Sequence, residues 1–283
     1  MANLILPRRF TQQPQYPVGI DRSNPLAHGL VAIFDPLSLR FGDLPPVGNT
    51  SLPRVGTSGV GVTTAAAGNK FIEFAHNEKF AQTGDLSLGF VFDVDALTNY
   101  SALISKEGTT TTNVPYELRA GSAATGSNFE LLRANGSSYK SFAGVGNKLT
   151  VGQKNVRLVV TAPSGIQNAP TGYINGQKFS MPTASGSGTG ASADNGTSKV
   201  QIGTRPDAVT YFDGGFYLVG IWNRQLTEPE AIEWTCNPWQ IFRPRKQILY
   251  FDVAASGIPT LSFPAATSIT ATSAVPQVTL TFA

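Results

Sequence analysis

Residues Gly172-Tyr173-Ile174-Asn175-Gly176-Gln177-Lys178-Phe179 form the strongest local signal in this chain of 283 residues. Asparagine and glycine both tolerate the positive φ angles of a type I′ turn, so the central Asn175-Gly176 pair predicts a two-residue β-hairpin. The residues on either side of the pair then belong to two antiparallel strands.

The clearest single strand lies upstream, over residues 86–92. Leu86, Leu88, Phe90 and Phe92 recur at period two, so they share one face of a strand, and we expect that face to enter a core. Segments rich in Gly, Ser, Thr and Asn separate the other predicted strands, which cover residues 30–34, 71–74, 102–105, 116–120, 129–133, 138–142, 156–161, 199–203, 215–222 and 247–252.

One helix is predicted, directly after residue 227. Thr227 and Glu230 have the spacing of a capping box, Ala231 to Trp234 continue the helix, and Asn237-Pro238 stops it. Trp222 and Trp234 lie in apolar surroundings on the last strand and on this helix, so we expect both in the core. The sequence therefore predicts an all-β protein with one short helix.

The composition excludes several classes of protein. Charged residues are 14% of the chain, against roughly 25% in an average globular protein, and 29 Gly with 19 Pro are typical of many turns between short strands. A scattered net charge of +3 is too small for a nucleic-acid groove. No run approaches the ~20 apolar residues of a membrane span. Cys236 is the single cysteine, so no internal disulfide framework is expected.

The N-terminus is expected to lack a secretion signal. Its apolar run, Asn3 to Leu6, is shorter than the about 7–15 residues of a signal-peptide core. We expect synthesis in the cytoplasm without export through the secretory route.

We divide the chain into an extended N-terminal arm over residues 1–27, one sandwich domain over 28–253 and a C-terminal β extension over 254–283. The arm contains four prolines and no strand or helix period. The extension ends in a strand with one apolar face, which favours pairing with another chain. The residues expected to dock both segments onto partners are Arg8, Arg9, Phe10, Tyr16, Val278, Leu280 and Phe282.

The order of five segments resembles the second half of a laminin-G-like jelly roll, the concanavalin A-like lectin/glucanase fold. These segments are residues 155–161, the hairpin at 172–176, Val200 to Gly203, Phe212 to Phe216, and Ile221 to Thr227. The resemblance covers residues 150–236 by motif and 28–149 by pattern. It implies a jelly-roll β-sandwich, and it says little about function because such folds serve many functions.

The flanks resemble the ends of laminin-G-like proteins encoded by tailed bacteriophages and prophages. The matching segments are Pro17 to Asp21, Ser23 to Leu30, and Asn237 to Phe242. This resemblance implies a virion protein, and a phage protein needs no secretion signal because it leaves the cell by lysis. We therefore expect a non-enzymatic structural component of the virion, either a capsid decoration or head appendage, or a tail-fibre or baseplate module. The expected partners are other virion proteins and further copies of the chain.

Two other functions stay open. The first is an adhesin that binds a host glycan through the rim loops, including the low-complexity loop 183–198, with Tyr139, Tyr173 and Tyr211 as aromatic platforms. The second is a glycosidase. The Glu-x-Asp-x-x-Glu arrangement of the fold's glucanases is absent, and the nearest pair of carboxylates, Asp93 and Asp95, is explained by a solvated turn. We expect no enzyme activity.

No cofactor is expected. Many laminin-G-like domains bind calcium at one rim, and the candidates for such a site here are Asp213, before Gly214-Gly215, and Asp194, before Asn195-Gly196. Both also fit turns, because Asp and Asn adopt turn conformations readily.

Overall fold

The computed structural model describes residues 10–14, 18–37, 39–49, 51–56, 58–67, 69–98, 100–106, 112–121, 128–146, 148–194, 196–205, 210–244, 251–253, 259–261 and 269–270. The chain divides into two compact units, Met1–Arg243 and Pro244–Ala283. The predicted domain boundaries at residues 27/28 and 253/254 stay predictions.

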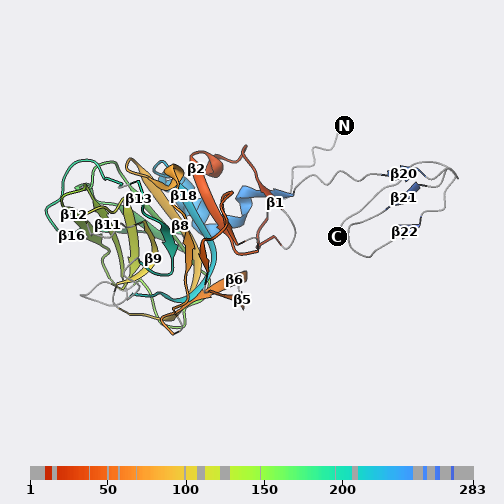
Figure 1. Cartoon of the computed structure of the whole chain (residues 1–283), viewed down its shortest axis with the longest axis horizontal. Coiled ribbons are helices and arrows are strands. Elements are labelled where there is room, and N and C mark those ends of the chain that lie inside the picture. The colour runs from red at the N-terminus through yellow and green to blue at the C-terminus, as the bar shows by residue number, and fades with distance from the viewer. Residues whose placement is uncertain are drawn as a thin grey trace. The chain divides into compact units, whose positions relative to one another are not determined.

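The larger unit is a sandwich of two antiparallel sheets, with β8, β18 and β2 in one sheet and β9, β11, β12 and β16 in the other (Figure 1). The first sheet has the order β15 (Gln177–Ser180), β14 (Thr171–Ile174), β13 (Val156–Ala162), β8 (Leu86–Ala96), β18 (Asp213–Trp222), β2 (Leu30–Asp35) and β3 (Arg40–Phe41), and the hairpin of β5 (Leu52–Gly56) and β6 (Gly59–Thr64) joins it at β18. The second sheet has the order β16 (Thr183–Ser185), β12 (Tyr139–Ala143), β11 (Phe129–Ala134), β10 (Tyr116–Ala120), β9 (Ser101–Lys106), β17 (Val200–Ile202), β7 (Ile72–Phe74) and β4 (Gly48–Asn49).

The predicted hairpin and helix are confirmed. Asn175 and Gly176 have φ angles of 48° and 83° between β14 and β15, as a type I′ turn requires. Helix α1 spans Glu228–Cys236, and the Glu230 carboxylate accepts a 2.8 Å hydrogen bond from the Thr227 amide to complete the capping box. The 3-10 helix η3 (Pro238–Ile241) follows at once.

The apolar core lies between the sheets. Phe90 and Phe92 of β8 pack there with residues of the second sheet such as Ile104 and Leu118. The other face of β8 is buried too, because α1 packs on the outside of the first sheet and forms a second cluster that includes Val91, Trp222 and Trp234. The two Trp rings meet edge to face at 5.0 Å, so both expected core tryptophans are confirmed.

The arm is described in part, and from Phe10 onward it contacts the sandwich. The side chain of Gln13 exchanges hydrogen bonds with the backbone of Val60, at 2.8 Å and 2.5 Å. Strand β1 (Val18–Ile20) pairs with β19 (Phe242–Pro244), and the 3-10 helix η1 (Pro25–Ala27) buries Leu26 completely. A further 3-10 helix, η2 (Glu78–Phe80), follows β7.

The structure differs from the expected loop at 183–198, and it describes only part of the strand expected over 247–252. The stretch 183–198, expected to be a loop, contains the strand β16, which pairs with β12. The strand expected over 247–252 lies largely outside the described residues. Phe251 and Asp252 belong to β20 (Phe251–Val253), which forms a small antiparallel sheet in the second unit with β21 (Pro259–Leu261) and β22 (Ile269–Thr270).

Candidate functional site

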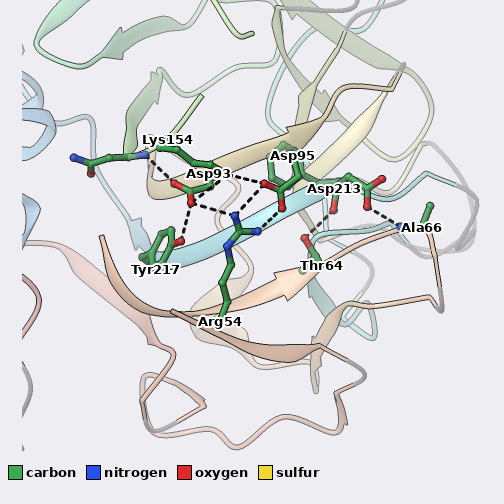
Figure 2. Close-up of polar contacts among 10 residues, drawn as sticks. Arg54, Thr64, Ala66, Asp93, Asp95, Lys154, Asp213 and Tyr217 are labelled. Atoms are coloured by element: carbon green, nitrogen blue, oxygen red, sulfur yellow. Dashed lines mark hydrogen bonds and ion pairs between the residues drawn. The ribbon is translucent and has the colours of Figure 1, made fainter. Parts of the chain in front are cut away.

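The carboxylate pair singled out in the sequence lies where the β5–β6 hairpin meets β8 and β18. Asp93 and Asp95 are two residues apart on β8, so they project from the same face of the strand, opposite to Phe92. Figure 2 shows that Arg54 of β5, Lys154 before β13 and Tyr217 of β18 converge on these two carboxylates.

Asp93 is not in a solvated turn, which corrects the interpretation from the sequence. Its side chain is 1% exposed, because the β5–β6 hairpin covers the end of β8. The carboxylate accepts 2.8 Å hydrogen bonds from the Tyr217 hydroxyl and the Asn155 amide, and a guanidinium nitrogen of Arg54 lies at 3.3 Å. The buried charge is thus fully compensated, as burial of a carboxylate requires.

Asp95 is held as a carboxylate by two cations. Arg54 binds both of its oxygens, and Lys154 Nζ lies 2.8 Å from Oδ1. The hydrogen bond from Arg54 is the main cause that lowers the pKa of Asp95 to about 2, and Lys154 adds to it. Two carboxylates therefore face two cations, and Asp95 stays ionised at neutral pH.

This cluster fastens the hairpin to the sheet. The fit is close, because a Cβ atom added to Gly56 would lie 1.8 Å from the Tyr217 hydroxyl oxygen, and one added to Gly215 would lie 2.6 Å from Cδ of Arg54. Burial, followed by the hydrogen bond to Asp93, raises the pKa of Tyr217, so the hydroxyl stays a donor. The arrangement is suited to stabilising the fold rather than to proton transfer.

The two calcium candidates lie in different surroundings. Asp213 Oδ1 accepts a 3.2 Å hydrogen bond from the Ala66 amide (Figure 2). Asp194 Oδ1 lies 2.9 Å from Nζ of Lys106, so a cation already neutralises this carboxylate and the group does not suit a metal ion. No group of three or more His, Cys, Asp or Glu side chains that could hold a metal ion occurs in the part of the chain that the structure describes.

The three tyrosines expected as sugar platforms are not brought together. Tyr139 lies on β12 and is 37% exposed. Tyr173 packs beneath α1 in the second cluster, and Tyr211 is bridged to Ala102 and Thr204, so both rings are buried. Tyr139 alone is accessible, beside the loop that contains Gly186 and Gly188.

Of the residues expected to dock the arms, only Phe10 lies within the described residues. Its ring packs against the second cluster, and its carbonyl accepts a 2.9 Å hydrogen bond from the Asn237 side chain. Arg8, Arg9, Tyr16, Val278, Leu280 and Phe282 lie outside the described residues.

A second buried polar cluster was not anticipated from the sequence. Lys106 at the end of β9 contacts His76, Asp194 and Ser198, three residues that follow β7 or precede β17. No local motif connects positions so far apart in the chain. The sequence offers one signal, because Lys106 lies two residues after the apolar stretch 102–104, on the face of the strand that Ile104 shares.

No described helix has both the length and the apolar character needed to cross a membrane.

Three solved structures are among those that are similar to this chain. The binding domain of Paraclostridial mosquitocidal protein 1 is similar with a TM-score of 0.52 and 16% identity, over 74% of this chain and 52% of that one. Domain 4 of an arabinanase from Geobacillus stearothermophilus, solved with arabinotriose, gives 0.49 and 16%, over 72% and 97%. A Trypanosoma rangeli sialidase gives 0.46 and 12%, over 76% and 33%.

The chain thus spans about half the length of the mosquitocidal binding domain that it resembles. No curated protein sequence matches it. The family model described as the concanavalin A-like lectin/glucanases superfamily matches residues 66–231, more than half of the chain. Two antiparallel sheets, the Asn-Gly hairpin and the capped helix after β18 agree with that match, and the chain belongs to this laminin-G-like family of the concanavalin A-like lectin/glucanase superfamily.

Proposed function

We propose that this chain is a non-enzymatic structural component of a tailed-phage virion, in which the ends of the chain anchor a lectin-like sandwich. The sandwich is the presented module, and the ends bind other virion proteins. Capsid decoration, head appendage, tail fibre and baseplate module all fit this proposal.

One observation carries the proposal: the two flanking motifs that resemble phage proteins lie against each other. The Asp21 amide donates a 2.7 Å hydrogen bond to the Ile241 carbonyl, and the buried Asn24 side chain donates one of 3.0 Å to the Gln240 carbonyl. Strands β1 and β19 pair beside them. The described parts of the two flanks therefore meet at one place on the sandwich, as an anchoring base requires.

The carboxylate cluster supports a function without catalysis. A retaining or inverting glycosidase needs one carboxyl group whose pKa is high enough to donate a proton. Arg54 and Lys154 instead keep Asp95 ionised, and Asp93 is enclosed by Tyr217, Asn155 and Arg54.

The test is removal of the ends, with boundaries chosen from the structure. Residues 1–9 and 245–283 are deleted, whereas Gln13 and Leu26 stay because they contact the sandwich. Deletion of both ends should abolish incorporation into particles while the soluble yield of the sandwich is kept. The readout is the amount of the chain in purified virions from a complemented phage.

The control removes two cations from the sandwich surface, as the deletion of residues 1–9 removes Arg8 and Arg9. Arg22 and Lys79 are exposed, so the Arg22→Ser/Lys79→Ser variant should enter particles normally. Normal incorporation of the chain that lacks both ends would refute anchoring by the ends.

A second candidate, binding of a host surface glycan, rests on Tyr139. Its exposed ring borders the loop that starts at β16, where the Gly188 amide donates to its carbonyl at 2.9 Å. If the rim binds sugar by stacking, Tyr139→Ala should weaken binding of host polysaccharide about tenfold, and Tyr139→Phe should preserve it. Calorimetric titration measures this, with Val145→Ala as an exposed apolar control. Absence of binding by the unaltered chain would exclude this candidate.

A further inference from the structure

Lys106 is a fully buried lysine at the end of β9. Its side chain is 0% exposed, and its Nζ lies 2.9 Å from Asp194 Oδ1, 3.1 Å from His76 Nδ1 and 3.0 Å from the Ser198 carbonyl oxygen. These three acceptors match the three protons of an ammonium group. The nitrogen is therefore held in one position, in contact with a carboxylate and away from water.

Asp194 is nearly as well shielded, with 8% of its side chain exposed. Such an ion pair has lost the hydration of both charges, and the mutual attraction of the charges recovers only part of that cost. A neutral link between the same two groups would remove both charges. The geometry thus favours chemistry that converts the pair into an uncharged product.

His76 is placed to move a proton between the two groups. Its Nδ1 lies 3.1 Å from Lys106 Nζ and 3.9 Å from Asp194 Oδ2, the carboxylate oxygen that Lys106 does not contact in the ion pair. Because an ammonium only donates, Nδ1 is the unprotonated ring nitrogen and Nε2 carries the proton toward Glu78 Oε1, at 3.2 Å. A base therefore contacts the amine and lies 3.9 Å from one carboxylate oxygen.

Tyr116 completes the surroundings of the pair. It stands directly opposite Lys106 in the β9–β10 register, its ring is fully buried, and its hydroxyl has no hydrogen-bond partner among the described residues. Burial, with the charge of Asp194 as a second cause, raises the pKa of Tyr116 well above its ordinary value, so the hydroxyl keeps its proton. A neutral phenol therefore stands opposite Lys106 and adds no further charge to the pair.

We propose that Lys106 and Asp194 join in an isopeptide bond that forms without an external catalyst. The Nζ–Cγ bond forms and the Cγ–Oδ2 bond breaks. The ammonium loses two of its three protons, and both leave with Oδ2 as one water molecule. His76 takes a proton from Nζ and passes it to Oδ2, so it ends unchanged. No oxidant or other reactant is needed.

The enclosed site explains why this condensation would proceed although free amines and carboxylates do not condense in water. Groups held in reactive contact behave as if at effective molarities on the order of 10⁵–10⁸ M. Exclusion of water also slows the reverse hydrolysis. The link joins residues 88 positions apart and ties the loop before β17 to the second sheet, in a chain with a single cysteine.

The mass of the purified full chain tests the proposal directly. After days at neutral pH, the denatured chain should weigh one water molecule less than its sequence, and proteolysis should yield a branched peptide that contains Lys106 and Asp194. A chain that keeps its full sequence mass overturns the proposal, and so does a lost water that maps to another pair. This measurement needs no variant, so a folding defect cannot obscure it.

Three variants test the assigned roles. Lys106→Arg should keep its full mass, because a guanidinium does not condense. Asp194→Asn should lose ammonia instead of water and end with the same mass as the cross-linked native chain. His76→Ala should form the link on the order of a hundredfold more slowly, as expected for a lost acid–base group. An unchanged rate in His76→Ala, with the fold confirmed by circular dichroism, would contradict the role given to His76.

Discussion

Replacement of Arg133 by alanine should lower the free energy of unfolding by about 3–5 kcal/mol. Arg133 lies on β11 with only 4% of its surface exposed. Its guanidinium donates to the carbonyl oxygens of Pro115 at 3.1 Å, Pro163 at 2.9 Å, Thr83 at 2.9 Å and Gly84 at 2.8 Å. Without the arginine, the carbonyl groups of Pro163, Thr83 and Gly84 lose the donor that Arg133 gives them, and that of Pro115 keeps the Ser192 hydroxyl.

The geometry explains why no other residue can replace this arginine. Arginine has five donors in a planar fork, whereas lysine has three on one atom, so Arg133→Lys should recover only part of the loss. Burial lowers the pKa of Arg133 to about 10, and the nearby Asp85 opposes that shift. The group is thus still charged at neutral pH and still costly to bury.

Urea denaturation followed by circular dichroism measures this effect. Arg22→Ala, at an exposed position, should change stability by no more than about 0.5 kcal/mol. If Arg133→Ala proves as stable as Arg22→Ala, the role of Arg133 as the link between three segments is wrong.

Trp234→Ala should also destabilise the fold by about 3–5 kcal/mol. Trp234 is 0% exposed and joins helix α1 to the first sheet through its edge-to-face contact with Trp222. The space is filled closely: a Cβ atom added to Gly89 would lie 2.9 Å from Cζ3 of Trp222 and from Nε1 of Trp234. Removal of the indole leaves a cavity that the rigid sheet cannot close.

Trp234→Phe serves as the matched control in the same denaturation experiment. The indole nitrogen of Trp234 has no hydrogen-bond partner within the described part of the chain, so phenylalanine gives up volume but no hydrogen bond. Trp234→Phe should keep more than half of the free energy of unfolding that Trp234→Ala loses. Equal losses for Trp234→Ala and Trp234→Phe would mean that packing against Trp222 is not the source of the effect.

The sequence predicts the elements whose conformation depends on residues close together in the chain. Asn175-Gly176 predicts its hairpin because the turn depends on the φ angles of those two residues. Thr227 and Glu230 predict the start of α1 because a capping box lies within one helical turn. The strand at residues 86–92 is predicted because apolar residues recur at every second position and so share one face of the strand.

The polar clusters could not be predicted in the same way, because each is assembled from distant segments. In the sequence, the surroundings of Asp93 fit a turn, because its partners are far away in the chain. Arg54 lies 39 positions earlier and Tyr217 lies 124 positions later. The partners of His76 could not be predicted from the sequence either. Lys106 and Asp194 lie beside it only because β17 pairs with both β7 and β9. The burial of Tyr173 and Tyr211 could not be predicted from the residues around them in the sequence.

Quantitative mass spectrometry of gradient-purified particles tests whether the chain is a component of a virion. We expect a fixed number of copies of the chain per particle, unchanged by further purification or a high-salt wash. Hundreds of copies would indicate the capsid, and a few to dozens an appendage or the tail. Infective particles that contain none of the chain would contradict this expectation.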